Sequence, residues 1–175
     1  YGISKVAGFE LTRNFREAYG LFSCTGILFN HESPRRGFEF VTRKISSTAA
    51  RIKLGMEKEL RVGNIEAKRD WGYSAEYVQM MHKMLQQNEP EDFVIGTGIS
   101  HSVREFVEIV FKELELNYED YLVIDSRFFR PDESEILVAN TSKAREKLGW
   151  EPKVTFEELA LMMVRNDYDN LKKSV

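Results

Sequence analysis

The chain has 175 residues, of which 42% are hydrophobic and 30% charged, and its formal net charge is −3. This composition suits a globular protein of one domain, or of one domain and part of another, without general attraction to nucleic acid or anionic membranes. No apolar run approaches the roughly 20 residues of a membrane span, and no signal peptide is visible. The single cysteine, Cys24, excludes an internal disulfide, fits a cytoplasmic location and is expected to be a small core residue.

Strand and helix signals alternate along the chain, which favours an α/β architecture. A helix is predicted over residues 4–19, with Val6, Phe9 and Phe15 among its apolar positions and Gly20 as its end. The next run, LFSCTGILF, predicts a buried parallel strand that delivers the loop NHESPRRG (30–37) to a ligand-binding sheet edge. The following elements are a helix at about 38–54, a strand at ELRVGN (59–64), a helix at 73–87 and a buried strand at DFVIGTG (92–98).

Two S/T-x-x-E pairs mark the starts of the last two long helices. Ser102 with Glu105 precedes a helix over 102–116, and Thr155 with Glu158 precedes the final helix. Between them lie YLVIDSRFF, a loop around Arg130 and Pro131, and a short helix that begins at Asn140 or Thr141 and closes at Gly149. Aromatic and methionine positions of the helices are expected in the core; they are Phe106, Phe111, Met80, Met84, Met162 and Met163.

The first residues, YGISK, place a tyrosine and a lysine four positions apart. On a helix this spacing puts Tyr1 and Lys5 on one face, and an ammonium beside a phenol favours the phenolate form. Such a tyrosine can act as acid and base toward a substrate hydroxyl. The spacing alone is weak, because Tyr168 and Lys172 repeat it in a polar stretch that fits a solvated helix face.

The segment NHESPRRGFEFVTRK concentrates positive charge beside a predicted helix start. Its four cations, at a site where free N–H groups favour anions, are typical of a pyrophosphate clasp; they are Arg35, Arg36, Arg43 and Lys44. Asn30 and His31 follow a buried strand and so face a ligand crevice. A charged solvated loop is the alternative, and a structural role is the alternative for His31. No histidine or cysteine spacing supports a zinc site.

Two further clusters have ordinary and functional interpretations. In AKRDWGY, Lys68 and Arg69 precede Asp70 and Trp71, and the ordinary interpretation is a turn pinned by a half-buried tryptophan with an exposed ion pair. In RPDE, Arg130 suits a phosphate or ribose and Glu133 suits sugar hydroxyls, although a surface ion pair is the alternative.

No G-x-G-x-x-G phosphate loop occurs in the sequence, so a YxxxK enzyme would be incomplete here. Tyr1 is therefore expected to be an internal residue of a longer polypeptide. The missing strands are expected to leave exposed apolar sheet edges.

Several motifs together resemble one family. In chain order, YGISKVAGFELTRNFREAYGL, LFNHESPRRGFEFVTRKI, GNIEAKRDWGY, HSVREF and FRPDE resemble the C-terminal half of the GDP-mannose 4,6-dehydratases, which are extended short-chain dehydrogenases. The resemblance covers almost the whole chain, and NHESPRRG and KRDWGY are far more specific than YxxxK.

The resemblance implies the C-terminal part of a Rossmann-type parallel sheet plus a smaller α/β substrate-binding domain, with the N-terminal cofactor-loop half absent. Residues 1–37 and about 72–100 would be the remaining parts of the NADP-binding Rossmann domain. Residues of about 38–71 and 101–175 would mainly form the GDP-sugar domain and the C-terminal helices.

The implied reaction converts GDP-mannose to GDP-4-keto-6-deoxymannose by internal hydride transfer through NADP, a lyase reaction of GDP-fucose biosynthesis. Tyr1 matches the tyrosine that deprotonates the sugar 4-hydroxyl, and Lys5 the lysine that holds the nicotinamide ribose. The remaining matches are His31 and Arg36 for the cofactor, and Asn30, Arg36, Lys44, Arg69, Arg130 and Glu133 for the GDP-sugar.

The family's threonine or serine, its glutamate and its glycine-rich loop lie upstream of the position of Tyr1. We therefore expect the 175-residue chain alone to lack measurable activity and to bind NADP poorly, and the complete protein to be active as a homo-oligomer, a dimer or tetramer. A related nucleotide-sugar epimerase or reductase, and a non-catalytic GDP-sugar-binding half-domain, are the alternatives. The coding sequence upstream of Tyr1 distinguishes the half-domain from an enzyme, since a glycine-rich turn and a Thr-x-Glu segment there would indicate the enzyme.

Overall fold

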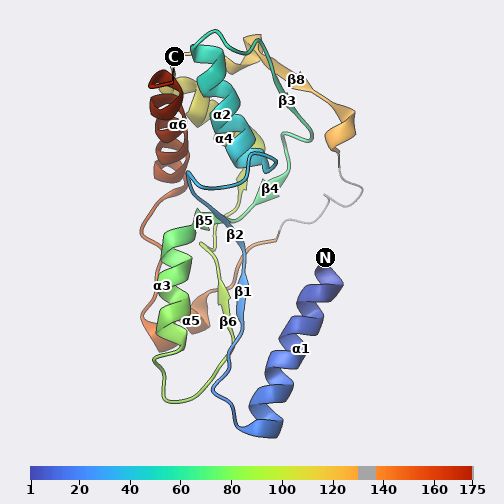
Figure 1. Ribbon diagram of the computed structural model, residues 1–175, viewed down its shortest axis with the longest axis vertical. Helices are drawn as coiled ribbons and strands as arrows, with labels where there is room; N and C mark the ends of the chain where they lie inside the picture. The colour runs from blue at the N-terminus through green and yellow to red at the C-terminus, as the bar shows by residue number, and fades with distance from the viewer. Residues whose placement is uncertain (130–136, 175) are drawn as a thin grey trace.

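The computed structural model describes residues 1–129 and 137–174. Helices and strands alternate through most of this part of the chain (Figure 1). The helices are α1 (Gly2–Tyr19), α2 (Val41–Lys53), α3 (Ser74–Met84), α4 (Val103–Glu113), α5 (Ser142–Leu148) and α6 (Phe156–Lys172), with short 3-10 helices η1 (Tyr118–Asp120) and η2 (Ser126–Phe128). The strands are β1 (Gly26–Leu28), β2 (Asn30–Glu32), β3 (Leu60–Val62), β4 (Lys68–Arg69), β5 (Trp71–Tyr73), β6 (Phe93–Ile95), β7 (His101–Ser102) and β8 (Leu122–Ile124).

The strands form three parallel pairs and one antiparallel pair within the described residues. The parallel pairs are β1 with β6, β2 with β5 and β3 with β8, whereas β4 and β7 run antiparallel. Strands β1 and β2 follow each other with only Phe29 between them, and the Phe29 N–H donates to the Ile95 carbonyl at 2.8 Å. Parallel pairing between strands separated by helices is the expected α/β arrangement.

Two clusters of buried side chains hold the fold together. The first core cluster joins α2, α4 and α6 to β3, with Ile45, Phe106 and Met163 fully buried among its members. The second core cluster joins α3, β6 and α5, with Tyr77, Met80 and Ile95 fully buried. Figure 1 shows these two groups of elements in the upper and lower parts of the molecule, with β2 and β5 between them. Within the described ranges, none of the helices combines the length and apolar character needed to cross a bilayer.

Helix α1 differs from the other long helices because none of its residues is buried. It ends where predicted, at Gly20, whose φ of 63° is left-handed and suits glycine. In Figure 1 it stands beside β1, with its N-terminal end toward the middle of the molecule. Most of its large apolar side chains stay exposed, with Val6 at 62% and Phe15 at 46%, while Phe9 is half-buried.

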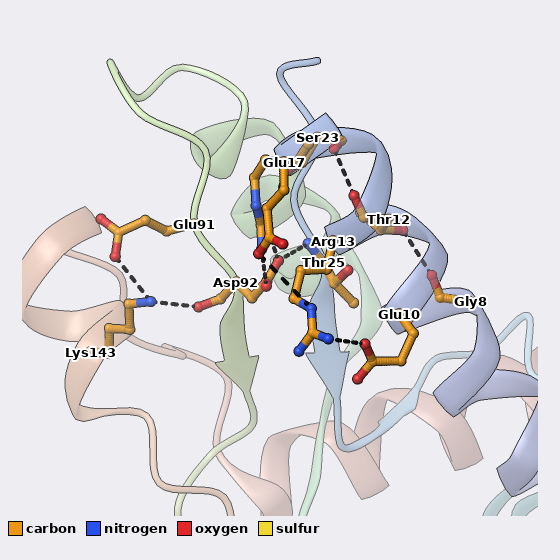
Figure 2. Close-up of polar contacts among 11 residues, drawn as sticks. Gly8, Glu10, Thr12, Arg13, Glu17, Ser23, Thr25, Glu91, Asp92 and Lys143 are labelled. Carbon is orange, nitrogen blue, oxygen red and sulfur yellow. Dashed lines mark hydrogen bonds and ion pairs between the residues drawn. The ribbon is translucent and has the colours of Figure 1, made fainter. Parts of the chain in front are cut away.

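Polar contacts tie the C-terminal half of α1 to the start of β6. Figure 2 shows Ser23 bonded back to Thr12 of the helix, and Asp92 beside Thr25. The Thr25 N–H donates to Asp92 Oδ1 at 2.6 Å, and Lys143 Nζ donates to the Asp92 carbonyl at 2.8 Å. Asp92 also pairs with Arg16 of α1, so it connects α1, the residue before β1, and α5.

The predicted helix ends are largely confirmed. Thr155 and Glu158 form the reciprocal capping box, and α5 begins after Thr141 and closes at Gly149. At α4 only half of the box forms: Ser102 accepts the Glu105 N–H, while the Glu105 carboxylate pairs with His101 at 2.6 Å. The predicted aromatic and methionine core is also confirmed, with Met162 only partly buried.

Three local predictions were wrong. The strand in LFSCTGILF is parallel but not buried, because β1 pairs with β6 alone among the described residues and Ile27 is 45% exposed. Residues 30–32 were expected in a loop but form β2, since they pair with β5. AKRDWGY is not a turn but strands β4 and β5, and Trp71 is 3% exposed rather than half-buried because it packs in the first core cluster.

Candidate functional site

Tyr1 and Lys5 lie together at the N-terminal end of α1. The Lys5 Nζ lies 5.1 Å from the centre of the Tyr1 ring, as the four-residue helical spacing predicts. Tyr1 is 95% exposed, so the described residues place the pair on an open surface.

Strands β2 and β5 bring Asn30, His31 and Arg69 into one region. Asn30 pairs with Trp71 and His31 with Gly72, and Arg69, the last residue of β4, lies two residues before Trp71 in the chain. His31 Nδ1 is 2.9 Å from the Phe29 carbonyl oxygen. The backbone positions of Asn30, His31 and Arg69 are therefore close to one another in this ladder.

Tyr77 of α3 packs against the paired strands β2 and β5. Its hydroxyl donates to the Asn30 carbonyl at 3.4 Å, and its ring centre lies 5.3 Å from that of His31. A Cβ on Gly72 would lie 2.6 Å from the Tyr77 ring, so only glycine lets the strand approach this closely. Burial, reinforced by the carboxylates of Asp70, Glu32 and Glu76, raises the pKa of Tyr77 and keeps its phenol neutral.

Glu32 lies at the centre of the cationic segment and is 1% exposed. Its Oε2 accepts a hydrogen bond from Thr42 Oγ1 at 2.5 Å and lies 3.3 Å from Arg36 Nε. The Arg36 guanidinium also stacks on Phe40, 3.6 Å from the ring centre. Burial raises the pKa of Glu32, while Thr42, Arg36 and His31 oppose that rise.

Lys44 of α2 lies next to the segment that leads to Arg130. Its Nζ is 3.6 Å from the centre of the Phe128 ring in η2. Burial lowers the pKa of Lys44, and the nearby Asp125 opposes this shift. The predicted residues Arg130 and Glu133 lie outside the described residues.

Arg43 is not available to the predicted four-cation clasp, because it is paired with a carboxylate of α6. Arg43 Nη2 lies 2.7 Å from Asp167 Oδ1 of α6, and Ser46 Oγ donates to Asp167 Oδ2 at 2.6 Å. Both partners are nearly buried, so this pair joins α2 to α6 instead of facing a ligand. Arg35, in contrast, is exposed.

Asp70 is a buried acceptor that the sequence analysis missed. It is 1% exposed and accepts bonds from the N–H and hydroxyl of Thr97, from the Gly98 N–H and from the Ala139 N–H, at 2.6–3.1 Å. Asp70 therefore holds together the loop after β6 and the chain entering α5, directly beside Arg69.

Glu32 and Phe128 were also missed. The signal for Glu32 was a single carboxylate among the cations of NHESPRRG, where a buried cation requires a counter-charge. Phe128 has no such signal, because its contact with Lys44 joins segments that are distant in sequence.

A separate open groove of about 650 Å³ lies between the starts of α4 and α6. Its floor includes the stacked rings of His101 and Phe156, whose centres are 3.9 Å apart. Among the residues that the structure describes, its lining includes none of the predicted site residues.

Comparisons with known proteins agree with this arrangement of elements. The chain superposes on RMD from Pseudomonas aeruginosa complexed with NADPH with a TM-score of 0.89 at 21% identity, covering 97% of this chain and 56% of that one. This likeness establishes the fold: the predicted α/β fold, which corresponds to about half of that protein.

Sequence relatives are more specific than the fold. The chain is 52% identical over 173 residues to GDP-mannose 4,6 dehydratase 1 of Arabidopsis thaliana, covering 99% of this chain and 48% of that protein. It is 46% identical over 189 residues to GDP-mannose 4,6 dehydratase of Homo sapiens, covering 98% and 51%. The chain thus spans about half the length of the curated relatives it matches. A family model described as GDP-mannose 4,6 dehydratase matches residues 1–163, and the chain belongs to that family.

Proposed function

We propose that the complete protein is an NADP-dependent lyase that converts GDP-mannose to GDP-4-keto-6-deoxymannose. The observation that carries this proposal is the family match over residues 1–163. The P. aeruginosa protein of the same fold is complexed with NADPH, which supports a nicotinamide cofactor. We further propose a cytoplasmic homo-oligomer, a dimer or tetramer, for which the free thiol of Cys24 suits a reducing compartment.

The two core clusters suggest which elements bind the cofactor and which bind the sugar nucleotide. Residues 1–37 and about 72–100, with α1, β1, β2, α3 and β6, would belong to the cofactor-binding domain, against which α5 packs in the second core cluster. The elements of the first core cluster would form most of the sugar-nucleotide-binding domain. The ladder of β2 with β5 lies between them and carries Asn30 and His31.

Tyr1 would take the proton of the sugar 4-hydroxyl, and Lys5 would favour its phenolate and hold the nicotinamide ribose. The proximity of Lys5 Nζ to the Tyr1 ring suits this role. When bound, the cofactor supplies a reversible hydride acceptor. His31 and Arg36 would orient it from β2 and the following turn.

Asn30, Arg36, Lys44 and Arg69, together with Arg130 and Glu133, would hold the GDP-sugar. Cations suit the pyrophosphate, and the Glu133 carboxylate suits hydroxyl groups. The partly buried Lys44 would be the most sensitive of these cations to pH. Its lowered pKa means that it loses its charge at a lower pH than a solvated lysine does.

The decisive experiment assays the polypeptide translated from the complete gene. Incubation with GDP-mannose and NADP should give GDP-4-keto-6-deoxymannose, whereas UDP-glucose should give no product. Turnover of the UDP-sugar instead would identify an epimerase or reductase. GDP binding without turnover of either sugar would identify a binding module.

A pair of lysine variants in α2 tests the site itself. Lys44→Met should weaken GDP binding about tenfold by calorimetry, because it removes a partly desolvated phosphate contact. Lys53→Met is the matched control, since Lys53 is an exposed lysine of the same helix, and its GDP affinity should equal that of the unaltered protein. Equal affinity in both variants would remove Lys44 from the site.

A further inference from the structure

We propose that Glu32 is a positioning residue that holds Arg36 ready for a nucleotide phosphate. This inference rests on the proposed function, because it concerns the same site. Glu32 itself touches no ligand in this proposal. It acts through the guanidinium of Arg36 and through Thr42.

The orientation of Arg36 is the first observation. Glu32 Oε2 lies 3.3 Å from Nε, at the inner edge of the guanidinium, and Phe40 covers one of its faces at 3.6 Å. The terminal Nη1 and Nη2 groups form a second edge of the planar guanidinium, which differs from the edge at Nε. These two groups form the fork that binds phosphate oxygens in pairs.

The burial of Glu32 is the second observation. Its side chain is 2% exposed, and that of Arg36 is 22% exposed. Burying a carboxylate costs free energy unless it has polar or charged partners. Thr42 and Arg36 are the partners that stabilise Glu32 in this buried position. The exposed remainder of Arg36 is the part available to a ligand.

The third observation is that one carboxylate oxygen serves two elements. Oε2 of Glu32 also accepts the Thr42 hydroxyl at 2.5 Å, and Thr42 lies in the first turn of α2, two residues before Lys44. Glu32 therefore fixes both the turn that carries Arg36 and the helix that carries Lys44.

Two effects of Glu32 on phosphate binding oppose each other. Its negative charge reduces the attraction between Arg36 and an anion. Without Glu32, however, a long side chain must be ordered on binding, at a cost of roughly 0.5–1.5 kcal/mol, equivalent to about 2- to 12-fold in affinity. The Glu32 charge is in contact with Nε rather than with the phosphate-binding edge, so we expect ordering to prevail.

Two other side chains interact with the charge of Glu32, so a test must leave them unaltered. His31 precedes it on β2, and Tyr77 of α3 interacts with its charge. Every affinity is therefore measured at the same fixed pH of 8.

The test measures NADPH and GDP affinities of the protein translated from the complete gene. Glu32→Met should weaken binding of at least one nucleotide 2- to 12-fold. Glu32→Gln keeps the oxygen that accepts the Thr42 hydroxyl but loses the charge beside Arg36 Nε, so its affinity should lie between those of Glu32→Met and the unaltered protein. Glu76→Gln is the matched control: Glu76 is a buried carboxylate that accepts backbone N–H groups of Lys153 and Val154, and this variant should bind as the unaltered protein does.

A double-mutant cycle separates positioning from general structural damage. If Glu32 acts in part through Arg36, the combined variant Glu32→Met with Arg36→Met should lose less affinity than the sum of the two single losses. Fully additive losses, unchanged affinity of Glu32→Met for both nucleotides, or tighter binding by that variant would each overturn the proposal.

Folding is checked by thermal denaturation of every variant. If Glu32→Met does not fold, Thr42→Val and Thr42→Ser replace it. The valine should weaken binding and the serine should not, and equal affinities would refute the inference. Absence of nucleotide binding by the unaltered protein overturns the proposed function, and this inference with it. Normal binding by both the unaltered protein and Glu32→Met overturns the inference alone.

Discussion

Arg16 of α1 and Asp92, immediately before β6, form a bidentate ion pair across 76 positions of sequence. Nη1 donates to Oδ1 at 2.9 Å and Nη2 to Oδ2 at 2.8 Å, and both side chains are less than one-fifth exposed. Arg16 also donates to the Ser23 carbonyl at 3.0 Å. Because α1 has no buried residue, this pair is a principal attachment of the helix that carries Tyr1 and Lys5.

Asp92→Asn should loosen α1 without unfolding the two core clusters. The substitution removes a charge-assisted fork, and the hydrogen bonds of a charged group are each worth about 1.5–3 kcal/mol at most in such a setting. Hydrogen exchange should therefore accelerate in residues 2–19 and stay unchanged in α4 and α6. Glu10→Gln is the control, because its ion pair with Arg13 is about half exposed and contributes little. Unchanged protection of α1 in Asp92→Asn would show that other contacts hold the helix.

Acidification should produce the same loosening. The bond from Arg16 lowers the pKa of Asp92, aided by the Thr25 N–H and opposed by partial burial. Since the folded-state pKa lies below the unfolded one, the contribution of Asp92 is present above the unfolded pKa. It is lost as pH falls through the folded pKa. Protection of α1 should thus persist at pH 5 and decline from about pH 4 downward. In Asp92→Asn this acid-dependent step should disappear.

Asp70→Ala should be among the most destabilising single substitutions in the chain. It leaves the N–H groups of Thr97, Gly98 and Ala139 without their buried acceptor. An unsatisfied buried donor costs about 1–3 kcal/mol, so we expect a loss of about 3 kcal/mol or more in the free energy of unfolding. Urea denaturation measures this loss. A change below about 1 kcal/mol would mean that water replaces the carboxylate.

Gly72→Ala should disturb the ladder below Asn30 and His31. The added methyl would meet the Tyr77 ring at 2.6 Å, and overpacking of this kind costs about 1–3 kcal/mol. Gly8→Ala is the matched control, since a Cβ at this α1 position meets nothing within 4 Å and should stabilise the helix by roughly 0.5–1 kcal/mol. Thermal denaturation should separate the two variants in opposite directions.

Local signals predicted the helices well. The apolar spacing of α4, the Thr155–Glu158 capping box and the glycines at positions 20 and 149 act within a few residues, so they can be identified from sequence. The short strands were harder to predict. AKRDWGY has turn-forming residues, yet it is drawn into β4 and β5 by pairing with His101–Ser102 and Asn30–Glu32. Pairing between distant segments overrides local preference.

The candidate site was predicted only in part for the same reason. The cationic segment could be identified as a group, but its members have different surroundings: Arg36 contacts Glu32 and Phe40, while Arg43 pairs with Asp167 from the last helix.

The amino-acid sequence by itself determined the α/β class, the family and the helix ends, because these depend on residue types at short spacings. The tertiary structure alone decided which cation is buried in an ion pair and which carboxylates become internal acceptors. It also decided that α1 is attached through Arg16 and Asp92. Such roles depend on which distant segments pack together, and burial then sets the energy of each charge.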